Sequence, residues 1–281
     1  MQVSYSRVST FKQCPYQFKL RYIDKLEPLF NLDPANALVL GTAMHEGIEK
    51  DVITAITGYY SNYPSVTPAM VNEAIKLEVM IGKAREALPR GVYEMKLETD
   101  DFKGFIDLLV KVDEKRKILV PSGRINPNTG EVMGYEKEDY QMNEIYDLYD
   151  FKYSNNVKNY MESGQLHIYK YFFEMLNPGK TIRNLFFVFI PKVKLKQEEN
   201  ESLEQYRARL QTVCREESIN IAPVEFDYRK VVDFLLDTKH LLECQEFEKK
   251  PNNLCYFCDY KNYCYSNGEN MVGLIKKEDN M

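Results

Sequence analysis

The chain has 281 residues, 44% of them hydrophobic, which excludes a disordered chain and allows a full hydrophobic core. No run approaches the roughly 20 apolar residues needed to cross a bilayer, and the N-terminus lacks a signal peptide's charged and apolar regions. We therefore expect a cytoplasmic protein (in the host cytoplasm if it is viral) with no membrane partner. The net charge of −5 disfavours non-specific coating of nucleic acid, but local contacts still permit a nuclease.

The first third of the chain is predicted to be helical. Ser and Thr residues between Ser6 and Pro15 are placed to cap a short helix, and a second helix carries Phe18, Tyr22 and Leu26. Apolar periodicity after a loop predicts two longer helices, over residues 38–56 and 68–87.

The pattern then changes to strands. A period of two residues predicts strands over 92–98, 102–112 and 145–153. Between the last two we expect a turn at 113–117, the start of a short strand at 118–120, and a hairpin or mobile loop at 121–138, which is rich in Pro, Gly and Asn.

The last part of the chain adds one strand and several helices. Asn155 and Asn156 are placed to cap a helix over 157–176, and a wholly apolar strand follows at 182–190, as expected for a strand covered on both faces. Two further helices are predicted over 202–217 and 228–247. This order of elements predicts an α/β fold with a central mixed β-sheet flanked by helices.

Asp150 and Lys152 lie in the strand predicted over 145–153. Side chains two positions apart on a strand project from the same face. A carboxylate and an ammonium on a buried face are costly unless they serve each other or a ligand. Taken alone, this pair is most simply an ion pair on a half-exposed strand.

A second carboxylate makes a metal site the better interpretation. Asp107 is embedded in apolar residues of the strand predicted over 102–112, and it converges with Asp150 if the two strands are neighbours. Two close carboxylates repel unless a divalent cation lies between them. Oxygen ligands of this kind suit Mg²⁺ or Mn²⁺. A metal-bound water is a competent nucleophile for a phosphodiester, and Lys152 is placed to position that water or to stabilise charge on the phosphate.

Three further polar positions accompany these residues. Gln165 and Tyr169 are four apart on the following helix, so they share one face and can orient the lysine or donate to a phosphate. His45 lies in the helix predicted over 38–56 and can complete a metal shell of one imidazole and two carboxylates. Glu94 is a weaker candidate for the same pocket.

The order of these motifs resembles the RecB-like branch of the PD-(D/E)XK nucleases. Gly-Thr-x-x-His, Gly-Phe-Ile-Asp, Asp-Phe-Lys and Gln-x-x-x-Tyr follow one another along the chain. The resemblance implies a restriction-endonuclease-like core in which the metal is held by His45, Asp107, Asp150 and the backbone oxygen of Phe151. It makes Lys152 catalytic and assigns the branch's Gln-Tyr motif to Gln165 and Tyr169.

The cysteines form a second constellation. Cys255, Cys258 and Cys264 lie close together in a turn-rich segment, and Cys14 lies near the other end of the chain. Without a secretory signal, metal binding is favoured over disulfides, and such a metal centre staples the two chain ends. Zinc is the simplest metal for four thiolates. Cys214 and Cys244 fall on predicted helices and are expected to be buried thiols.

The same order of cysteines, one early and three late, resembles the iron–sulfur-containing branch of this family, the AddB-like and CRISPR-adaptation nucleases. The resemblance implies that Cys14, Cys255, Cys258 and Cys264 hold a [4Fe-4S] cluster, with Zn²⁺ as the alternative. We divide this single nuclease domain into an iron–sulfur module (residues 1–30 and 245–270), a helical part (31–90) and a PD-(D/E)XK core (91–244).

These features predict a Mg- or Mn-dependent deoxyribonuclease. The resemblance implies an exonuclease that acts on single-stranded DNA ends in recombination, repair, or phage or CRISPR DNA processing. The alternative is a DNA-binding accessory subunit of a recombination or CRISPR-adaptation complex, and a zinc-stapled structural protein ranks last. Cleavage polarity, the choice between DNA and RNA, a helicase or recombination partner, and the role of residues 113–144 are not determined by the sequence.

Overall fold

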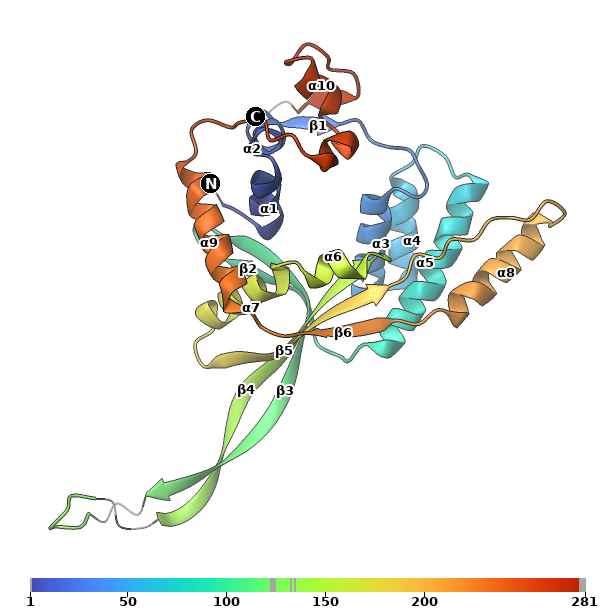
Figure 1. Ribbon diagram of the computed structural model, residues 1–281. Helices are drawn as coiled ribbons and strands as arrows, with labels where there is room; N and C mark the ends of the chain where they lie inside the picture. The colour runs from blue at the N-terminus through green and yellow to red at the C-terminus, as the bar shows by residue number, and fades with distance from the viewer. Residues whose placement is uncertain (1, 122–124, 132, 134, 278–281) are drawn as a thin grey trace.

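The computed structural model describes residues 2–121, 125–131, 133 and 135–277. Helices cover both faces of a mixed five-stranded sheet in this part of the chain (Figure 1). Neighbouring strands are antiparallel except β4 and β5, which are parallel. The predicted α/β class with a central mixed sheet is therefore confirmed. The strands lie in the order β2 (Val92–Glu98), β3 (Lys103–Pro121), β4 (Tyr135–Tyr153), β5 (Lys180–Ile190) and β6 (Asn220–Val224).

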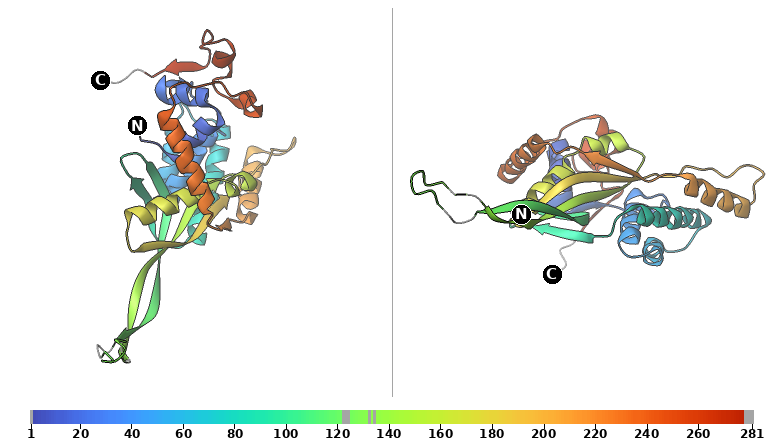
Figure 2. Two further views of the ribbon diagram at one scale, coloured as in Figure 1. Left: turned by 60° about the vertical axis from the view of Figure 1, so that its left-hand side comes forward. Right: turned by 90° about the horizontal axis from the view of Figure 1, so that it is seen from below.

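Helices lie on both sides of the sheet (Figure 2), and the alternation of side chains along the strands gives a hydrophobic core on each face. Leu108 and Val188 pack into the first core, whereas their neighbours Leu109 and Phe187 pack into the second. The first face is covered by α3 (Ala37–Glu49), α4 (Val52–Ser61), α5 (Pro68–Ala87) and α8 (Leu203–Glu216). The second face is covered by α1 (Tyr5–Gln13), α2 (Pro15–Phe18), α7 (Gln165–Leu176) and α9 (Tyr228–Glu243).

The helices predicted over 38–56 and 68–87 had different outcomes. The second is confirmed as α5, which begins at Pro68 after the Thr67 side chain caps it. The first prediction is wrong, because the segment is two helices and the first of them, α3, ends at Glu49 with Lys50 as its C-cap. There the Asp51 carboxylate accepts the N–H of Thr54 at 2.8 Å and begins α4. The predicted helix is therefore divided by an N-cap residue, Asp51, that lies inside the apolar periodic sequence.

The helix predicted over 157–176 is also two helices, α6 (Val157–Met161) and α7. Gly164 is the N-cap of α7, so the break places Gln165 at the first position of that helix. Together the two helices form the crossover that the parallel pair β4–β5 requires. The helix predicted over 202–217 is confirmed as α8. The helix predicted over 228–247 is confirmed as α9, which ends earlier, at Glu243. Strand β6 between them was not predicted.

The turn expected at 113–117 is wrong. Both β3 and β4 run continuously for 19 residues and pair from Leu108↔Tyr149 to Pro121↔Tyr135. They form a long two-stranded arm that projects from the body of the molecule (Figure 1). The loop expected over 121–138 lies partly outside the described residues, and β4 already begins at Tyr135.

The two ends of the chain meet in a small unit of their own. Strand β1 (Leu26–Pro28) pairs with β7 (Leu274–Lys276), and Leu20, Leu26, Tyr260 and Leu274 form a separate core. The second predicted helix therefore ends before Leu26, after a π-helical turn over Lys19–Ile23. The unit also contains a 3-10 turn at Asn253–Phe257 and α10 (Lys261–Tyr265). Within the described residues, no helix combines the length and apolarity that a bilayer span demands.

Candidate active site

Strands β3 and β4 bring the two predicted acidic residues side by side. Leu108 pairs with Tyr149, so Asp107 and Asp150 occupy the next position of the same antiparallel ladder. Both side chains are buried, with exposed fractions of 8% for Asp107 and 1% for Asp150. Two buried carboxylates on adjacent strands repel each other and require nearby positive charge.

The backbone of Phe151 connects this ladder to helix α3. Its N–H donates to Asp107 Oδ2 at 2.6 Å, and its carbonyl oxygen accepts from His45 Nε2 at 3.1 Å. The other nitrogen of His45, Nδ1, lies 3.5 Å from Asp107 Oδ1. His45 thus contacts two other predicted metal ligands, Asp107 and the Phe151 carbonyl.

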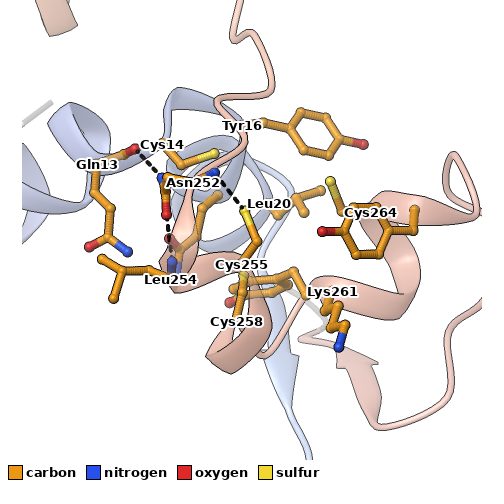
Figure 3. A pocket seen from close by; sticks show the side chains of 13 residues that line it. Gln13, Cys14, Tyr16, Leu20, Asn252, Leu254, Cys255, Cys258, Lys261 and Cys264 are labelled. Carbon is orange, nitrogen blue, oxygen red and sulfur yellow. Dashed lines mark hydrogen bonds between the residues drawn. The ribbon is translucent and has the colours of Figure 1, made fainter.

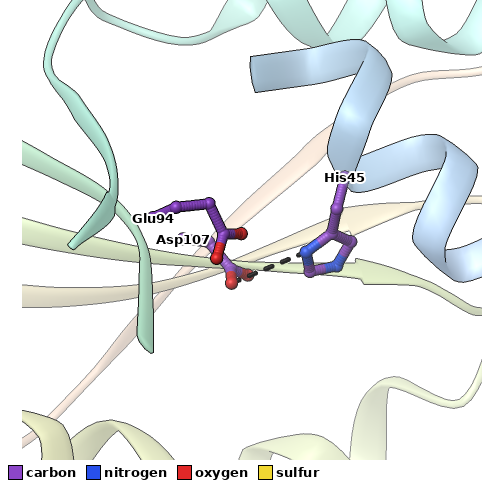
Figure 4. A group of neighbouring side chains, drawn as sticks. All are labelled: His45, Glu94 and Asp107. Atoms are coloured by element: carbon purple, nitrogen blue, oxygen red, sulfur yellow. Dashed lines mark ion pairs between the residues drawn. The ribbon is translucent and has the colours of Figure 1, made fainter. Parts of the chain in front are cut away.

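Glu94 on β2 completes a group of possible metal ligands. One ligand atom from each of His45, Glu94 and Asp107 lies within 4.8 Å of the others, the sole such group found among the described residues (Figure 4). Glu94 has a backbone φ of +50°, a conformation that costs a non-glycine residue about 1 kcal/mol or more. Residues held under such strain concentrate at functional sites. Glu94 was only a secondary candidate because sequence does not reveal a positive φ.

The charges of this group shift the pKa values of its members. Burial opposes the charge on His45, yet the Asp107 carboxylate overcomes it and raises the pKa of His45 to about 8. Burial raises the pKa of Asp150 to about 6 against the opposing effect of the Lys152 ammonium. Partial burial, followed by repulsion from Asp107, also raises the pKa of Glu94. The group therefore favours a positive charge between its carboxylates.

The donor atoms fit a hard divalent cation. Neither oxygen of Asp150 has a hydrogen-bond partner within the described part of the chain, although Oδ2 forms an ion pair with Lys152. Carboxylate and carbonyl oxygens with one imidazole suit Mn²⁺ or Mg²⁺. His45, Glu94, Asp107 and the Phe151 carbonyl would hold such an ion. Asp150, the other predicted ligand, lies outside the three-residue group and pairs with Lys152, so its place among the metal ligands stays a prediction.

A chain of contacts leads from Asp150 to the predicted Gln-Tyr motif. Lys152 Nζ pairs with Asp150 and donates to Gln165 Oε1 at 3.1 Å. Gln165 Nε2 in turn donates to the Tyr169 hydroxyl at 3.1 Å. Burial lowers the pKa of Lys152, but Asp150 and Asp107 more than offset this and raise it above its ordinary value. The lysine is therefore a fixed cation next to the carboxylates.

Gly104 explains the glycine of the Gly-Phe-Ile-Asp motif. A Cβ atom at this position would lie 2.9 Å from Tyr169 Cε1 and 3.1 Å from the ring of Phe102. Real Cβ contacts are not that short, so any larger residue displaces the tyrosine. The glycine lets the Tyr169 ring lie directly against β3, three residues before Asp107.

The four cysteines of the predicted cluster line one pocket at the junction of the chain ends (Figure 3). All six cysteines are free thiols. Burial raises the pKa values of Cys258 and Cys264, and proximity to Cys14 and Cys255 adds to both effects. No three of the four sulfurs lie within 4.8 Å of one another, as judged over the described residues. Of the other two cysteines, Cys214 is fully buried and Cys244 is half-buried.

Basic residues after the end of β5 and in α8 are engaged in contacts within the fold. Arg209 binds Glu201 through two nitrogens, at 2.7 and 2.6 Å, and Arg207 donates to Asn72. Lys192 lies over the ring of Tyr153 at 5.2 Å. These contacts favour a structural role for these residues.

Of three comparisons with known proteins, a family model supports a nuclease. The family model of the PD-(D/E)XK nuclease superfamily matches residues 2–120, which include His45 and Asp107. A solved structure of a candidate exonuclease from Eubacterium rectale aligns over 91% of this chain and 92% of its own, at 10% identity and a TM-score of 0.45. No curated protein matches the sequence. The resemblance to the superfamily is confirmed, whereas its iron–sulfur branch is not.

Proposed function

Because the sequence matches the PD-(D/E)XK nuclease superfamily, we propose that this chain is a Mg²⁺- or Mn²⁺-dependent deoxyribonuclease. The observation that carries the proposal is the convergence of His45, Glu94 and Asp107 beside the Asp150–Lys152 pair. The matched region ends before Asp150, so the geometry of the sheet, and not the match, supports the role of this pair.

Each residue has a distinct role in phosphodiester hydrolysis. His45, Asp107, Asp150 and the Phe151 carbonyl would bind the cation, with Glu94 as a further ligand. The bound cation would supply an activated water and neutralise charge on the phosphate. Lys152 stabilises the negative charge that develops on the phosphate oxygens. Asp150 holds the Lys152 ammonium in place, and Gln165 fixes it from the other side. Tyr169 orients Gln165 through its hydroxyl group.

The finer activity is an exonuclease that acts on single-stranded DNA ends. This part of the proposal is supported by the resemblance to RecB-like nucleases, as are roles in recombination, repair, or phage or CRISPR DNA processing. The cytoplasmic location and the partner remain predictions of the same kind.

The test uses end-labelled and circular single-stranded DNA with Mg²⁺, Mn²⁺ or EDTA. Wild type should cleave the linear strand in a metal-dependent way, and Lys152→Met should lose at least about 100-fold in rate, as removal of a group that stabilises transition-state charge does. Metal-independent cleavage, or equal rates for both proteins, would exclude this active site. Cleavage of the circular strand at the same rate would exclude the exonuclease.

For the cysteine pocket the proposal is a [4Fe-4S] cluster bound by Cys14, Cys255, Cys258 and Cys264. The choice of a [4Fe-4S] cluster over zinc rests on the resemblance of the cysteine order to the iron–sulfur branch, and the four cysteines line one pocket. Aerobically and anaerobically purified protein should show iron, sulfide and an absorbance band near roughly 400 nm, lost in Cys258→Ser. One equivalent of zinc without the band would favour the alternative.

A further inference from the structure

A groove of about 810 Å³ opens beside the candidate active site, between α1 and the beginning of β3. Its inner end is formed by Asp107, Gln165 and Tyr169, so it is continuous with the proposed catalytic residues. Its outer part is formed by the first turns of α1 and by Lys103. A volume of this size holds more than one nucleotide unit, given that pockets of about 300 to 1,000 Å³ enclose whole drug-sized ligands.

The chemistry of the groove suits phosphate groups. Arg7 and Lys103 supply two cations, and Ser6, Ser9 and Thr10 supply hydroxyl groups. The only carboxylate among the described residues of its lining is Asp107, which belongs to the metal site. Positive charge with many neutral donors is the composition of a surface that follows a nucleic-acid backbone.

Both cations are held in place by neighbouring groups. Arg7 donates to the carbonyl oxygen of Gln2 at 2.5 Å and lies 5.2 Å from the centre of the Tyr22 ring. Lys103 lies 5.5 Å from the centre of the Phe105 ring, and its backbone N–H donates to the Val3 carbonyl at 2.8 Å. The two cations therefore need little ordering when a polyanion binds.

The opposite side of the metal site has the reverse charge. A second hollow, of about 540 Å³, is lined by His45 together with Glu46, Glu49 and Glu94. Its lysine, Lys50, lies 2.9 Å from Glu46, and its histidine, His45, faces Asp107, so both are already paired. Phosphates are thus attracted to the α1 side of the site and repelled from the glutamate side.

We propose that the groove along α1 binds the phosphodiester backbone of a single DNA strand and leads it to the metal site. This inference rests on the proposed nuclease function and specifies the path of its substrate. The glutamate-lined hollow disfavours phosphates beyond the scissile bond, so the strand ends near the metal. A strand whose end lies near the metal would be cut close to that end, which would release short products.

The test measures binding of a fluorescein-labelled 20-nucleotide dT strand by anisotropy with Ca²⁺, after a gel has verified that the strand stays intact. The double variant Arg7→Gln/Lys103→Gln should bind the strand about 20-fold more weakly at 0.1 M salt. Its plot of log association constant against log salt concentration should also have a slope that is shallower by about 1.4. This difference corresponds to about 0.7 for each of the two phosphates that the variant no longer neutralises. Arg215→Gln/Lys239→Gln removes the same charge outside the groove and should match wild type in both measurements.

A second pair of variants separates charge from folding. Ser9 is exposed in the groove, so Ser9→Glu should weaken binding several-fold, whereas Ser9→Gln, of the same size, should not. Equal affinity of wild type, the double variant and Ser9→Glu would overturn the groove proposal, provided that wild type cleaves the strand with Mn²⁺. Failure of wild type to cleave would instead overturn the proposed function.

Discussion

The Asp107 carboxylate accepts the backbone N–H of Phe151 at 2.6 Å, across 44 residues of sequence. Because His45 donates to the carbonyl of Phe151, a single residue of β4 is held by a carboxylate of β3 and an imidazole of α3. Asp107 therefore has two tasks. One oxygen secures the sheet, and the charge of the group as a whole serves the proposed metal site.

Two substitutions at Asp107 should separate these tasks. Asp107→Asn keeps an oxygen for the Phe151 N–H but loses the charge, so we expect near-normal stability and no metal-dependent cleavage. Asp107→Ala leaves a buried N–H unpaired and should cost a further 1 to 3 kcal/mol or so in the free energy of unfolding. Urea unfolding and Mn²⁺ titration calorimetry measure the two effects. Equal stability of the two variants would contradict the structural task.

The sequence determines much of this site because its parts are local. Asp150 and Lys152 share a strand, and Gln165 and Tyr169 share a helix face, so spacing alone predicts which of them face the same way. Asp107 could be identified because it is an acidic residue surrounded by apolar residues in its predicted strand. These residues come together as expected, although their catalytic roles stay predictions.

Other features depend on partners distant in the chain. Glu94 enters the site through a positive φ that β2 adopts only against its neighbours. Strand β1 exists because β7, almost 250 residues later, pairs with it. The charged residues at 113–117 resemble those of a turn, whereas in the structure the pairing of β3 with β4 satisfies their backbone. The number of charged residues in a segment does not predict whether it pairs with a distant strand.

The imidazole of His45 should influence which metal the site prefers. Nitrogen ligands favour Mn²⁺ over Mg²⁺, whereas carboxylates suit both ions. We expect His45→Asp to lower the ratio of Mn²⁺- to Mg²⁺-supported kcat/KM several-fold. Activity with each metal, measured over a full range of concentrations, tests this. An unchanged ratio would place His45 outside the coordination shell.

Gly104 should control the position of Tyr169, because the ring lies where a larger side chain would be. Gly104→Ala forces the Tyr169 ring away, which disturbs Gln165 and then Lys152. We expect kcat to fall. The control is Gly82→Ala on α5, where nothing lies within 4 Å of the added Cβ and helix propensity favours alanine by up to about 1 kcal/mol. A normal kcat for Gly104→Ala would show that the position of Tyr169 does not influence Lys152.

His167 on α7 should make the stability of the fold depend on pH. The ring is 1% exposed, its Nδ1 accepts the Asp227 N–H at 3.1 Å, and its Nε2 has no partner among the described residues. Burial, with a smaller effect of Lys230, lowers the pKa of His167 to about 4. The unfolded chain, with a pKa near the ordinary 6.5, binds the proton more readily. The stabilisation is therefore complete above about pH 6.5 and is lost as the pH falls toward 4.

The expected loss from this histidine is about 2 kcal/mol between pH 7.5 and pH 5. His167→Asn keeps an acceptor for the Asp227 N–H but cannot be protonated in this range. Its free energy of unfolding should therefore fall by about 2 kcal/mol less than that of wild type over the same interval. His240→Asn, at an exposed position on α9, controls for the loss of a histidine and should behave as wild type. Because both variants carry the same substitution, a parallel loss in all three proteins would show that His167 is not the group that titrates.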